Sequence, residues 1–281
     1  MRRQLLLPPP DLAPWISVSM AIELDGAAGA TQLNRFPALV GSMLTVVLCG
    51  QVALWPPPGG APQRLPASFF TGPISAPLVS AHDGRLHCVA VGIRPVAASV
   101  LVGEGAALVA DRVVPAAQVW GAAWARWEEA IFTARDDTAR LGLLMRFVRS
   151  RIVRGADLVR RDRFARLEQA VLGQGVRGAA RELGLSERQL ERVFTANLGL
   201  RPKQFQRIAR VEAVLREALL TGRHDAQLAL RHGYYDQAHL ARDFRALAGA
   251  SLTELLAQTR LPRSEHWPLQ VGSAPPQRLV V

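Results

Sequence analysis

Cysteine is nearly absent from this 281-residue chain, which contains only Cys49 and Cys88. Two cysteines exclude the multi-bridge framework of a small secreted protein, and they are too few for a zinc-binding cysteine cluster. The amino end runs from Met1 to Leu7 directly into three prolines and offers no apolar core for a secretory signal. We therefore expect reduced thiols and a cytoplasmic location.

Long hydrophobic runs are also scarce. The stretch 38–55 is uncharged, but it contains Gly41, Gly50 and Gln51 and ends at three prolines. It is only marginally long enough to cross a bilayer, and a pair of buried strands fits its composition better. We therefore expect no membrane segment here.

Motifs of catalysis are missing as well. The chain has no glycine-rich phosphate loop and no Ser/His/Asp pattern. His82, His87 and Cys88 are close in sequence, but their spacing matches no metal signature, so packing or surface roles are favoured over a metal. The adjacent acidic pairs 128–129 and 136–137 would not face each other on a helix. We expect no enzyme activity, no metal and no cofactor.

Positive charge is concentrated in one half of the chain. Residues 149–263 hold 22 Arg and Lys against 12 Asp and Glu, a net charge of +10 out of +11 for the whole chain. Residues 1–148 carry a net charge of only +1. This asymmetry is typical of a phosphate-binding domain in the carboxyl half.

The basic half contains an internal repeat. Ala180-x3-Gly184 is followed by Leu190-x-Arg192-x-Phe194-x4-Gly199, and the same spacing returns about 50 residues later in Ala229-x3-Gly233 and Leu240-x-Arg242-x-Phe244-x4-Gly249. In each copy a glycine ends one helix in a left-handed turn. A capping residue, Ser186 or Asp236, then starts a second helix with one apolar face. Each copy thus predicts a helix-turn-helix unit.

A single helix is expected between the two units, from Pro202 to Leu220. Pro202 suits a first helical position, and apolar residues form an imperfect stripe from which Val211 deviates. At ~1.5 Å per residue the helix would be about 28 Å long, close to the ~34 Å turn of B-DNA. It could therefore place two recognition helices in successive major grooves.

The stretch 176–256 resembles the DNA-binding domain of the AraC/XylS family of bacterial transcription regulators. The second copy, from Gly233 to Phe244, is similar to the family signature, and Gly199-Leu200-Arg201-Pro202 matches the family pattern after the first recognition helix. One departure is Leu252, where the family usually has a second proline, so the start of the last helix is uncertain by a residue or two. The resemblance implies binding of double-stranded DNA, with RNA polymerase as a further candidate partner.

The pattern of short apolar runs in the amino half indicates a β-rich domain. Strands are expected at 16–24, 43–48, 51–55, 86–93 and 99–102, with a hairpin turn at 48–51. From Ala116 the apolar period becomes helical. Two stripes are expected to close over the β-core or to form a homodimer face; they comprise Trp120, Trp124, Trp127 and Ile131, and Leu141, Leu144, Met145, Val148 and Ile152.

Three short segments of the amino half resemble the effector-binding domains of some AraC-like regulators. They are residues 35–38, 70–73 and 92–95. This weaker resemblance implies a cupin-like domain that senses a small-molecule effector or dimerises, without naming a ligand.

Polar residues opposite the buried helix faces are the candidates for reading DNA. Arginine suits the guanine edge and glutamine the adenine edge, although Arg192 and Arg242 could instead form ion pairs within the domain. The expected base contacts are Arg188, Glu191, Arg192, Gln237, His239 and Arg242. The expected phosphate contacts, all near helix starts, are Ser186, Arg201, Lys203, Gln204 and Arg207.

The sequence therefore predicts an α+β chain with four parts. These are a β-rich, cupin-like domain (1–150), a linker (151–163), a double helix-turn-helix domain (164–262) and a flexible tail (263–281). The expected function is sequence-specific transcription regulation. Two alternatives are a DNA-directed alkylation-repair enzyme, for which the cysteines are too few, and a nucleoid protein indifferent to sequence.

Overall fold

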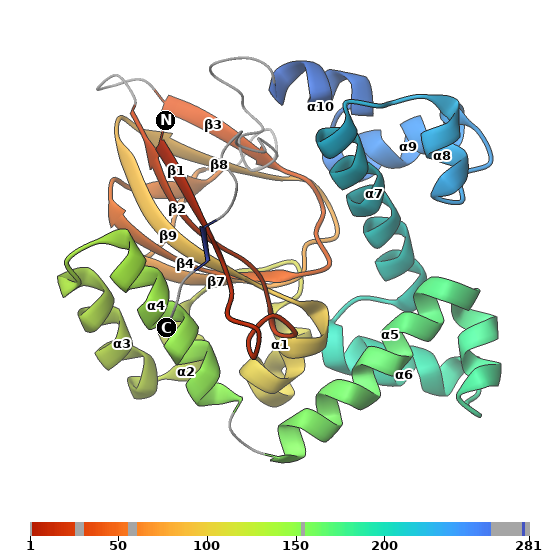
Figure 1. Cartoon of the computed structure of the whole chain (residues 1–281), viewed down its shortest axis with the longest axis horizontal. Helices are drawn as coiled ribbons and strands as arrows, with labels where there is room; N and C mark the ends of the chain where they lie inside the picture. The colour runs from red at the N-terminus through yellow and green to blue at the C-terminus, as the bar shows by residue number, and fades with distance from the viewer. Residues whose placement is uncertain (1, 26–30, 56–60, 153–154, 260–276, 279–281) are drawn as a thin grey trace.

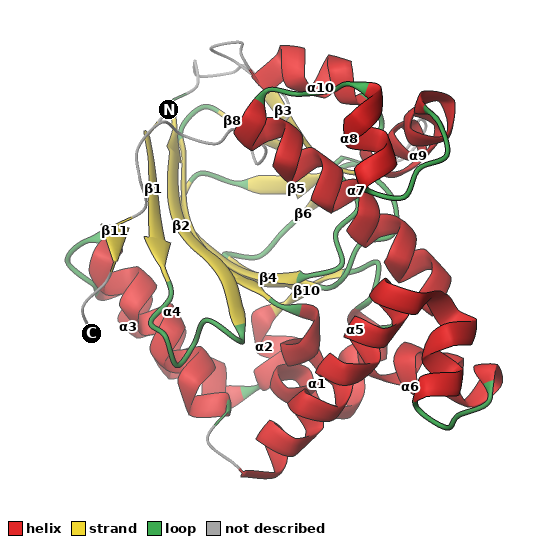
Figure 2. Ribbon diagram, turned by 45° about the vertical axis from the view of Figure 1, so that its right-hand side comes forward, coloured by secondary structure: helices red, strands yellow, loops and turns green. Residues whose placement is uncertain are grey.

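The structure, a computed structural model, describes residues 2–25, 31–55, 61–152, 155–259 and 277–278 (Figure 1). A curved β-structure from the amino half is flanked by short helices on one side and by the helices of the carboxyl half on the other (Figure 2). The expected α+β architecture, with a β-rich domain before an all-helical one, is confirmed.

Two sheets build the amino half. The larger has the strand order β10-β7-β4-β9-β2-β1-β11, in which every pair except β1–β11 is antiparallel. Its strands are β1 (Arg2–Leu7), β2 (Ile16–Leu24), β4 (Ser42–Cys49), β7 (Ser68–Thr71), β9 (Leu86–Ile93), β10 (Val113–Pro115) and β11 (Gln277–Arg278). The smaller sheet has the order β3-β8-β5-β6 and consists of β3 (Thr31–Phe36), β5 (Val52–Leu54), β6 (Gln63–Arg64) and β8 (Leu78–Asp83).

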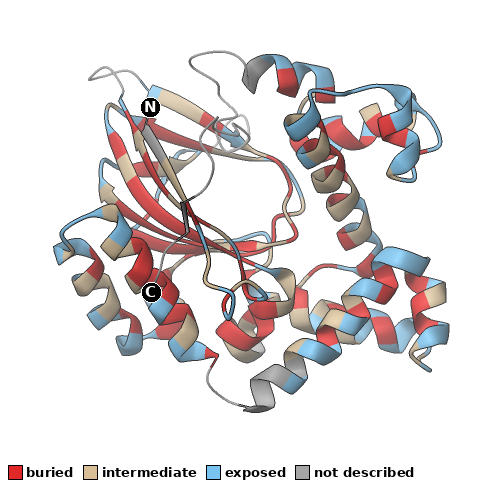
Figure 3. Cartoon of the chain, in the orientation of Figure 1, coloured by how far each residue is buried: buried red, intermediate tan, exposed pale blue. Residues whose placement is uncertain are grey.

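Short helices close the sheet domain at its lower edge in Figure 1. They are α1 (Pro95–Val102), the 3-10 helix η1 (Gly103–Val109), α2 (Ala116–Trp120), α3 (Ala122–Thr133) and α4 (Asp137–Arg151). Trp120 packs edge-on against Phe70 of the sheet, with ring centroids 5.4 Å apart, and Trp120 and Trp124 both pack edge-on against Phe147 of α4 at 4.9 Å. Trp120, Trp124 and Ile131 therefore lie in the core of the amino half, whose buried residues are red in Figure 3, and Trp127 packs against this core while partly exposed.

Three expectations for the amino half are wrong. Residues 99–102 belong to helix α1, because Pro95 starts a helix whose small and apolar residues are buried on nearly all sides. The turn at Gly50 is not a hairpin, because β4 and β5 belong to different sheets. The tryptophan stripe is split between α2 and α3 at Gly121, whose φ of 59° suits a residue without Cβ.

Six helices form the described part of the carboxyl half. They are α5 (Gly155–Glu182), α6 (Glu187–Leu198), α7 (Pro202–Thr221), α8 (Ala226–Arg231), α9 (Gln237–Ala248) and α10 (Leu252–Thr259). Helix α5 begins inside the expected linker, and a non-helical residue, Gly175 (φ 73°), divides it into two arms. The second arm and α6 form the first helix-turn-helix, and α8 and α9 form the second. The expected tail lies outside the described residues except for 277–278, which pair with β1.

Helix α7 joins the two units and spans nearly the expected range. Val211, expected to deviate from the stripe, is buried, as are Val214 and Ala218, whereas Leu220 is exposed. The reason is that α7 is covered on more than one side: by the helices of the carboxyl half and by the amino-terminal domain. A one-sided stripe therefore underestimates its buried surface.

The last helix begins at Leu252, the position of the usual proline. Ser251 caps it: its hydroxyl accepts a hydrogen bond from Glu254 N at 3.3 Å, and the Glu254 carboxylate accepts one from Ser251 N at 2.7 Å. This reciprocal cap satisfies the free N–H groups of the first turn. Proline is therefore not needed to define the start.

Candidate nucleic-acid interface

The first recognition helix, α6, is fixed at its amino end by a capping box. The Ser186 hydroxyl accepts a hydrogen bond from Gln189 N at 3.2 Å, and the Gln189 side chain accepts one from Ser186 N at 2.8 Å. Leu190, Phe194 and Leu198 are buried on the inner face. The outer face presents exposed Arg188, Glu191 and Arg192, and Arg188 and Arg192 line a small hollow with Ser186 and Gln189.

The second recognition helix, α9, repeats this design. Asp236 caps it by accepting a hydrogen bond from His239 N at 2.6 Å, and Leu240 and Phe244 are buried. Gln237 and Arg242 are exposed. His239 is only half exposed, because its ring packs edge-on against buried Tyr234 at 5.0 Å.

The arginines expected at base edges are not held by ion pairs. Within the part of the chain that the structure describes, Arg188, Arg192 and Arg242 form no salt bridge with an acidic side chain within 4.0 Å, and all three are exposed. The alternative of structural ion pairs for Arg192 and Arg242 therefore finds no support. Their side chains remain available to a ligand.

Two of the expected phosphate contacts are engaged within the protein. The guanidinium of Arg207 donates from Nε to Asp243 Oδ1 at 2.6 Å and joins α7 to α9. The Ser186 hydroxyl belongs to the cap of α6. The other three, Arg201, Lys203 and Gln204, are exposed at the amino end of α7, where free N–H groups also favour an anion.

Tyr235 was not expected from the sequence. It directly precedes the cap of α9, and 87% of its surface is exposed, the highest value among the large apolar residues described. Sequence periodicity could not identify it, because it lies in the turn and on neither helical face. An exposed aromatic ring two residues before Gln237 marks a candidate binding surface, and its exposure is established only by the structure.

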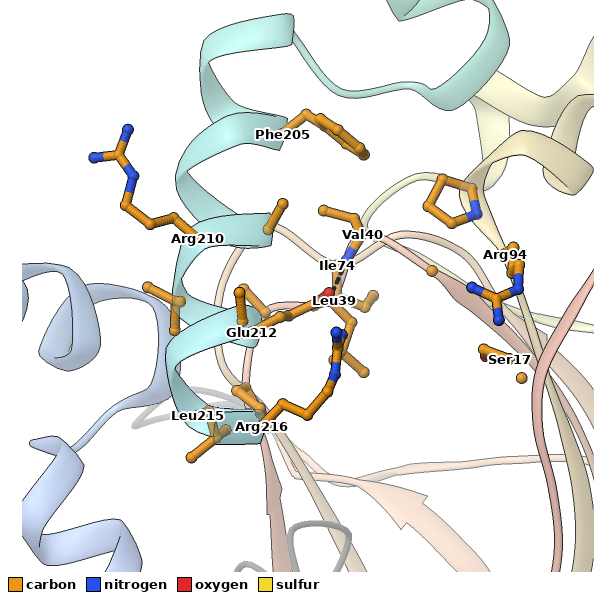
Figure 4. A pocket seen from close by; sticks show the side chains of 18 of the residues that line it. Ser17, Leu39, Val40, Ile74, Arg94, Phe205, Arg210, Glu212, Leu215 and Arg216 are labelled. Carbon is orange, nitrogen blue, oxygen red and sulfur yellow. Dashed lines mark hydrogen bonds between the residues drawn. The ribbon is translucent and has the colours of Figure 1, made fainter. Parts of the chain in front are cut away.

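A cleft of about 900 Å³ separates the sheet domain from α7 (Figure 4). Phe205, Leu215 and Leu219 of α7 line one wall. The opposite wall contains residues from all three segments that suggested an effector-binding domain: 36–38, 71–72 and 92–95. Segments far apart in the sequence therefore meet at one surface, which faces α7.

Two carboxyl groups lie in this cleft. Glu212 Oε1 accepts a hydrogen bond from Val40 N at 2.8 Å, and Glu168 Oε2 is buried without a hydrogen-bond partner. The pKa of each carboxyl is raised to about 7, mainly by burial, and the nearby Glu212 contributes to the rise at Glu168. Arg94 and Arg216 oppose these shifts but are exposed to solvent. Near neutral pH, the protonation of these two carboxyl groups therefore responds to small changes in pH or in their surroundings.

The two histidines of the amino half each have a partner within the protein. His82 contacts Asn34 at 3.0 Å, and His87 contacts Asp137 at 3.0 Å. Burial raises the pKa of the Cys88 thiol to about 12, which keeps it protonated and unreactive. No group of three His, Cys, Asp or Glu residues within the described ranges could hold a metal ion. Likewise, none of the described helices is both long and apolar enough to span a bilayer.

Comparisons with known proteins identify the carboxyl half. A family model described as a helix-turn-helix domain matches residues 179–258. Among solved structures, ToxT from Vibrio cholerae is similar, with 9% identity, a TM-score of 0.49 and coverage of 85% of this chain and 97% of that one. ToxT bound to an unsaturated fatty acid has 11% identity, a TM-score of 0.46 and coverage of 85% and 94%. No curated protein matches the chain.

The family match spans the second arm of α5 through α10 and includes both glycine turns and both capped helices described above. It agrees with the signature residues of the second copy. Residues 179–258 are an AraC-type helix-turn-helix domain.

Proposed function

We propose that this protein is a sequence-specific transcription regulator that binds double-stranded DNA through α6 and α9. The observation that supports this most is the duplicated recognition helix. Each copy has a capped amino end, a buried apolar face and an outer face with an unpaired arginine. A nucleoid protein indifferent to sequence would need the positive charge but not two such helices.

The residues divide into two roles. Arg188, Arg192, Gln237 and Arg242 read base edges, with Glu191 and His239 beside them on the same helices. Arg201, Lys203 and Gln204 bind phosphate and fix the register. Ser186 and Arg207 contribute mainly by holding the helices in place, because their polar atoms are already engaged.

Selection from random double-stranded DNA by the purified full chain tests this proposal. A regulator should enrich a motif with two half-sites, and the complete site should bind at least ~10³ more tightly than competitor DNA at moderate salt. Binding that changes with salt but enriches no motif would contradict the proposal and favour the nucleoid alternative.

We also propose that the cleft between the sheet domain and α7 is the site of a small-molecule effector. Its volume suits a drug-sized ligand, its walls are largely apolar, and a few polar groups converge on it. A thermal-shift screen of the full chain checks this, because a ligand that binds only the folded state raises the melting temperature. Wild type is compared with Leu215→Trp, which fills the cleft; a hit that stabilises both equally binds elsewhere.

A further inference from the structure

The carboxyl end of the first recognition helix rests directly on the amino-terminal domain. Helix α6 ends at Gly199, which has a φ of 75°. A Cβ on Gly199 would lie 2.3 Å from Ala110 Cβ and 3.0 Å from Ala107 O. These distances leave no room for any side chain, so the backbone of α6 is in contact with the segment at the end of η1.

The carboxyl end of the second recognition helix is held in the same way. The carbonyl of Leu247, near the end of α9, accepts a hydrogen bond from Ala38 N at 2.6 Å. Gly249, the cap of α9, faces Pro77, whose ring would lie 3.7 Å from an added Cβ. Both recognition helices are therefore anchored at their carboxyl ends, and their reading residues lie toward the opposite, amino ends.

A third contact lies midway along α7. Glu212 of α7 accepts a hydrogen bond from Val40 N, two residues after Ala38 (Figure 4). Ala38 and Val40 are buried in the same apolar cluster as the helix-turn-helix core. The amino-terminal domain thus contacts the first unit, the joining helix and the second unit.

The two recognition helices do not brace each other. Among the described residues, no hydrogen bond or ion pair joins α6 to α9. Their relative position depends on α7 and on the amino-terminal domain. The contacts form a closed ring: α6 contacts η1, the amino-terminal domain connects η1 to residues 38–40, and residues 38–40 contact α9 and α7. A closed ring is stiffer than a single helix, because bending α7 would have to break the other contacts.

We propose that the amino-terminal domain sets the distance and angle between the two recognition helices, with Ala110, Ala38 and Glu212 as positioning residues that determine which half-site spacing is bound. This inference rests on the proposed DNA-binding function. One base pair changes the separation of two half-sites by ~3.4 Å and rotates them by about 34°. A rigid ring prevents binding to a site whose spacing differs by one base pair, whereas two units joined by α7 alone could adjust to it.

The test compares half-site spacings in DNA selected by full-length variants. In Ala110→Leu, the larger side chain pushes η1 away from Gly199; Leu108→Ala is the matched control, because Leu108 is 70% exposed at the same 3-10 helix. In Glu212→Ala, the bond to Val40 is lost; Glu212→Gln keeps an acceptor and should restore the wild-type result. Melting temperatures and exchange of amide hydrogens report whether each variant is folded.

Wild type is expected to prefer one spacing by about tenfold over spacings one base pair longer or shorter. Ala110→Leu and Glu212→Ala should lower this preference to about twofold or shift it, while each half-site sequence is retained. Folded variants that keep the wild-type preference would overturn the inference. If Ala110→Leu does not fold, Glu212→Ala decides alone. Failure of the wild type to select two half-sites would instead reject the proposed function.

Discussion

Arg207 of α7 and Asp243 of α9 form an ion pair in which Nε lies 2.6 Å from Oδ1. The Asp243 side chain is only 6% exposed, whereas that of Arg207 is 48% exposed. The pair therefore joins a buried acid to a half-exposed base and fixes the second recognition helix on the joining helix.

The two sides of this pair are expected to respond unequally to mutation. Arg207→Ala leaves a buried carboxylate without its partner and should lower the free energy of unfolding by ~3 kcal/mol. Asp243→Asn removes the buried charge and leaves Arg207 free to meet solvent, so it should cost about 1 kcal/mol. Denaturant unfolding of both variants measures the difference, and equal losses would contradict the asymmetry.

The two cleft carboxyls predict a loss of stability as the pH rises. Each has a pKa of about 7 in the folded chain against an ordinary value of 4.5. Between these values the folded state binds more protons than the unfolded state, so the free energy of unfolding falls with increasing pH. Below pH 4.5 the two carboxyls do not lower the free energy of unfolding, and above pH 7 their destabilising effect reaches its full size.

Glu168→Gln isolates this effect. Because it removes a buried group that must ionise, the variant should gain stability over wild type at pH 8, by about 1–2 kcal/mol, and little at pH 5. Thermal or denaturant unfolding at the two pH values checks it. Exposed Glu191→Gln is the control, and a slope unchanged by Glu168→Gln would contradict the assignment.

Ser186 is expected to act as a helix cap. Ser186→Ala should lower the free energy of unfolding by ~1 kcal/mol, and Ser186→Asp, which also caps, should restore it. The aspartate variant also tests proximity to DNA, since a carboxylate near phosphate weakens binding by repulsion. Wild-type DNA affinity in Ser186→Asp would place phosphate away from this residue.

Base-reading and phosphate-binding residues should differ in their salt and sequence dependence. Arg188→Ala is expected to lose ~1–3 kcal/mol of discrimination at one base position. Lys203→Ala should weaken all sequences alike and reduce the salt slope by about one. Fluorescence anisotropy at several salt concentrations, on the selected site and on a scrambled one, separates the two behaviours.

The two thiols should differ in reactivity. Cys49 is exposed, whereas Cys88 is buried and its pKa is raised to about 12. An aromatic disulfide reagent at pH 8 is expected to modify Cys49 in the native chain and Cys88 only after unfolding. Cys49→Ser is the control, and rapid native labelling of that variant would show that Cys88 is accessible.

Local patterns predicted the carboxyl half well, because its signals are short-range. The glycine turns at 184 and 233, and the caps at 186 and 236, each depend on a few neighbouring residues and lie where expected. The apolar strands β2 and β9 have the expected bounds for the same reason.

Contacts between distant segments could not be predicted. The run 99–102 is apolar enough for a strand; Pro95 is a local signal for a helix start, but the burial of the helix on nearly all sides depends on its neighbours in space. Val211 deviates from a one-sided stripe because α7 is covered on several sides. The convergence of 36–38, 71–72 and 92–95 on one cleft depends on sheet topology, which no single segment encodes.

The bare backbone of Gly199 against Ala110 limits how this chain can be recombined. A chimaera that attached the carboxyl half to a foreign sensor would expose the carboxyl ends of both recognition helices, unless the new partner supplied a matching surface with a small residue opposite Gly199. Exchange of domains during evolution would therefore require coordinated substitutions on both sides of the contact between the two halves. The two halves have complementary surfaces, and we expect them to be inherited together as one unit.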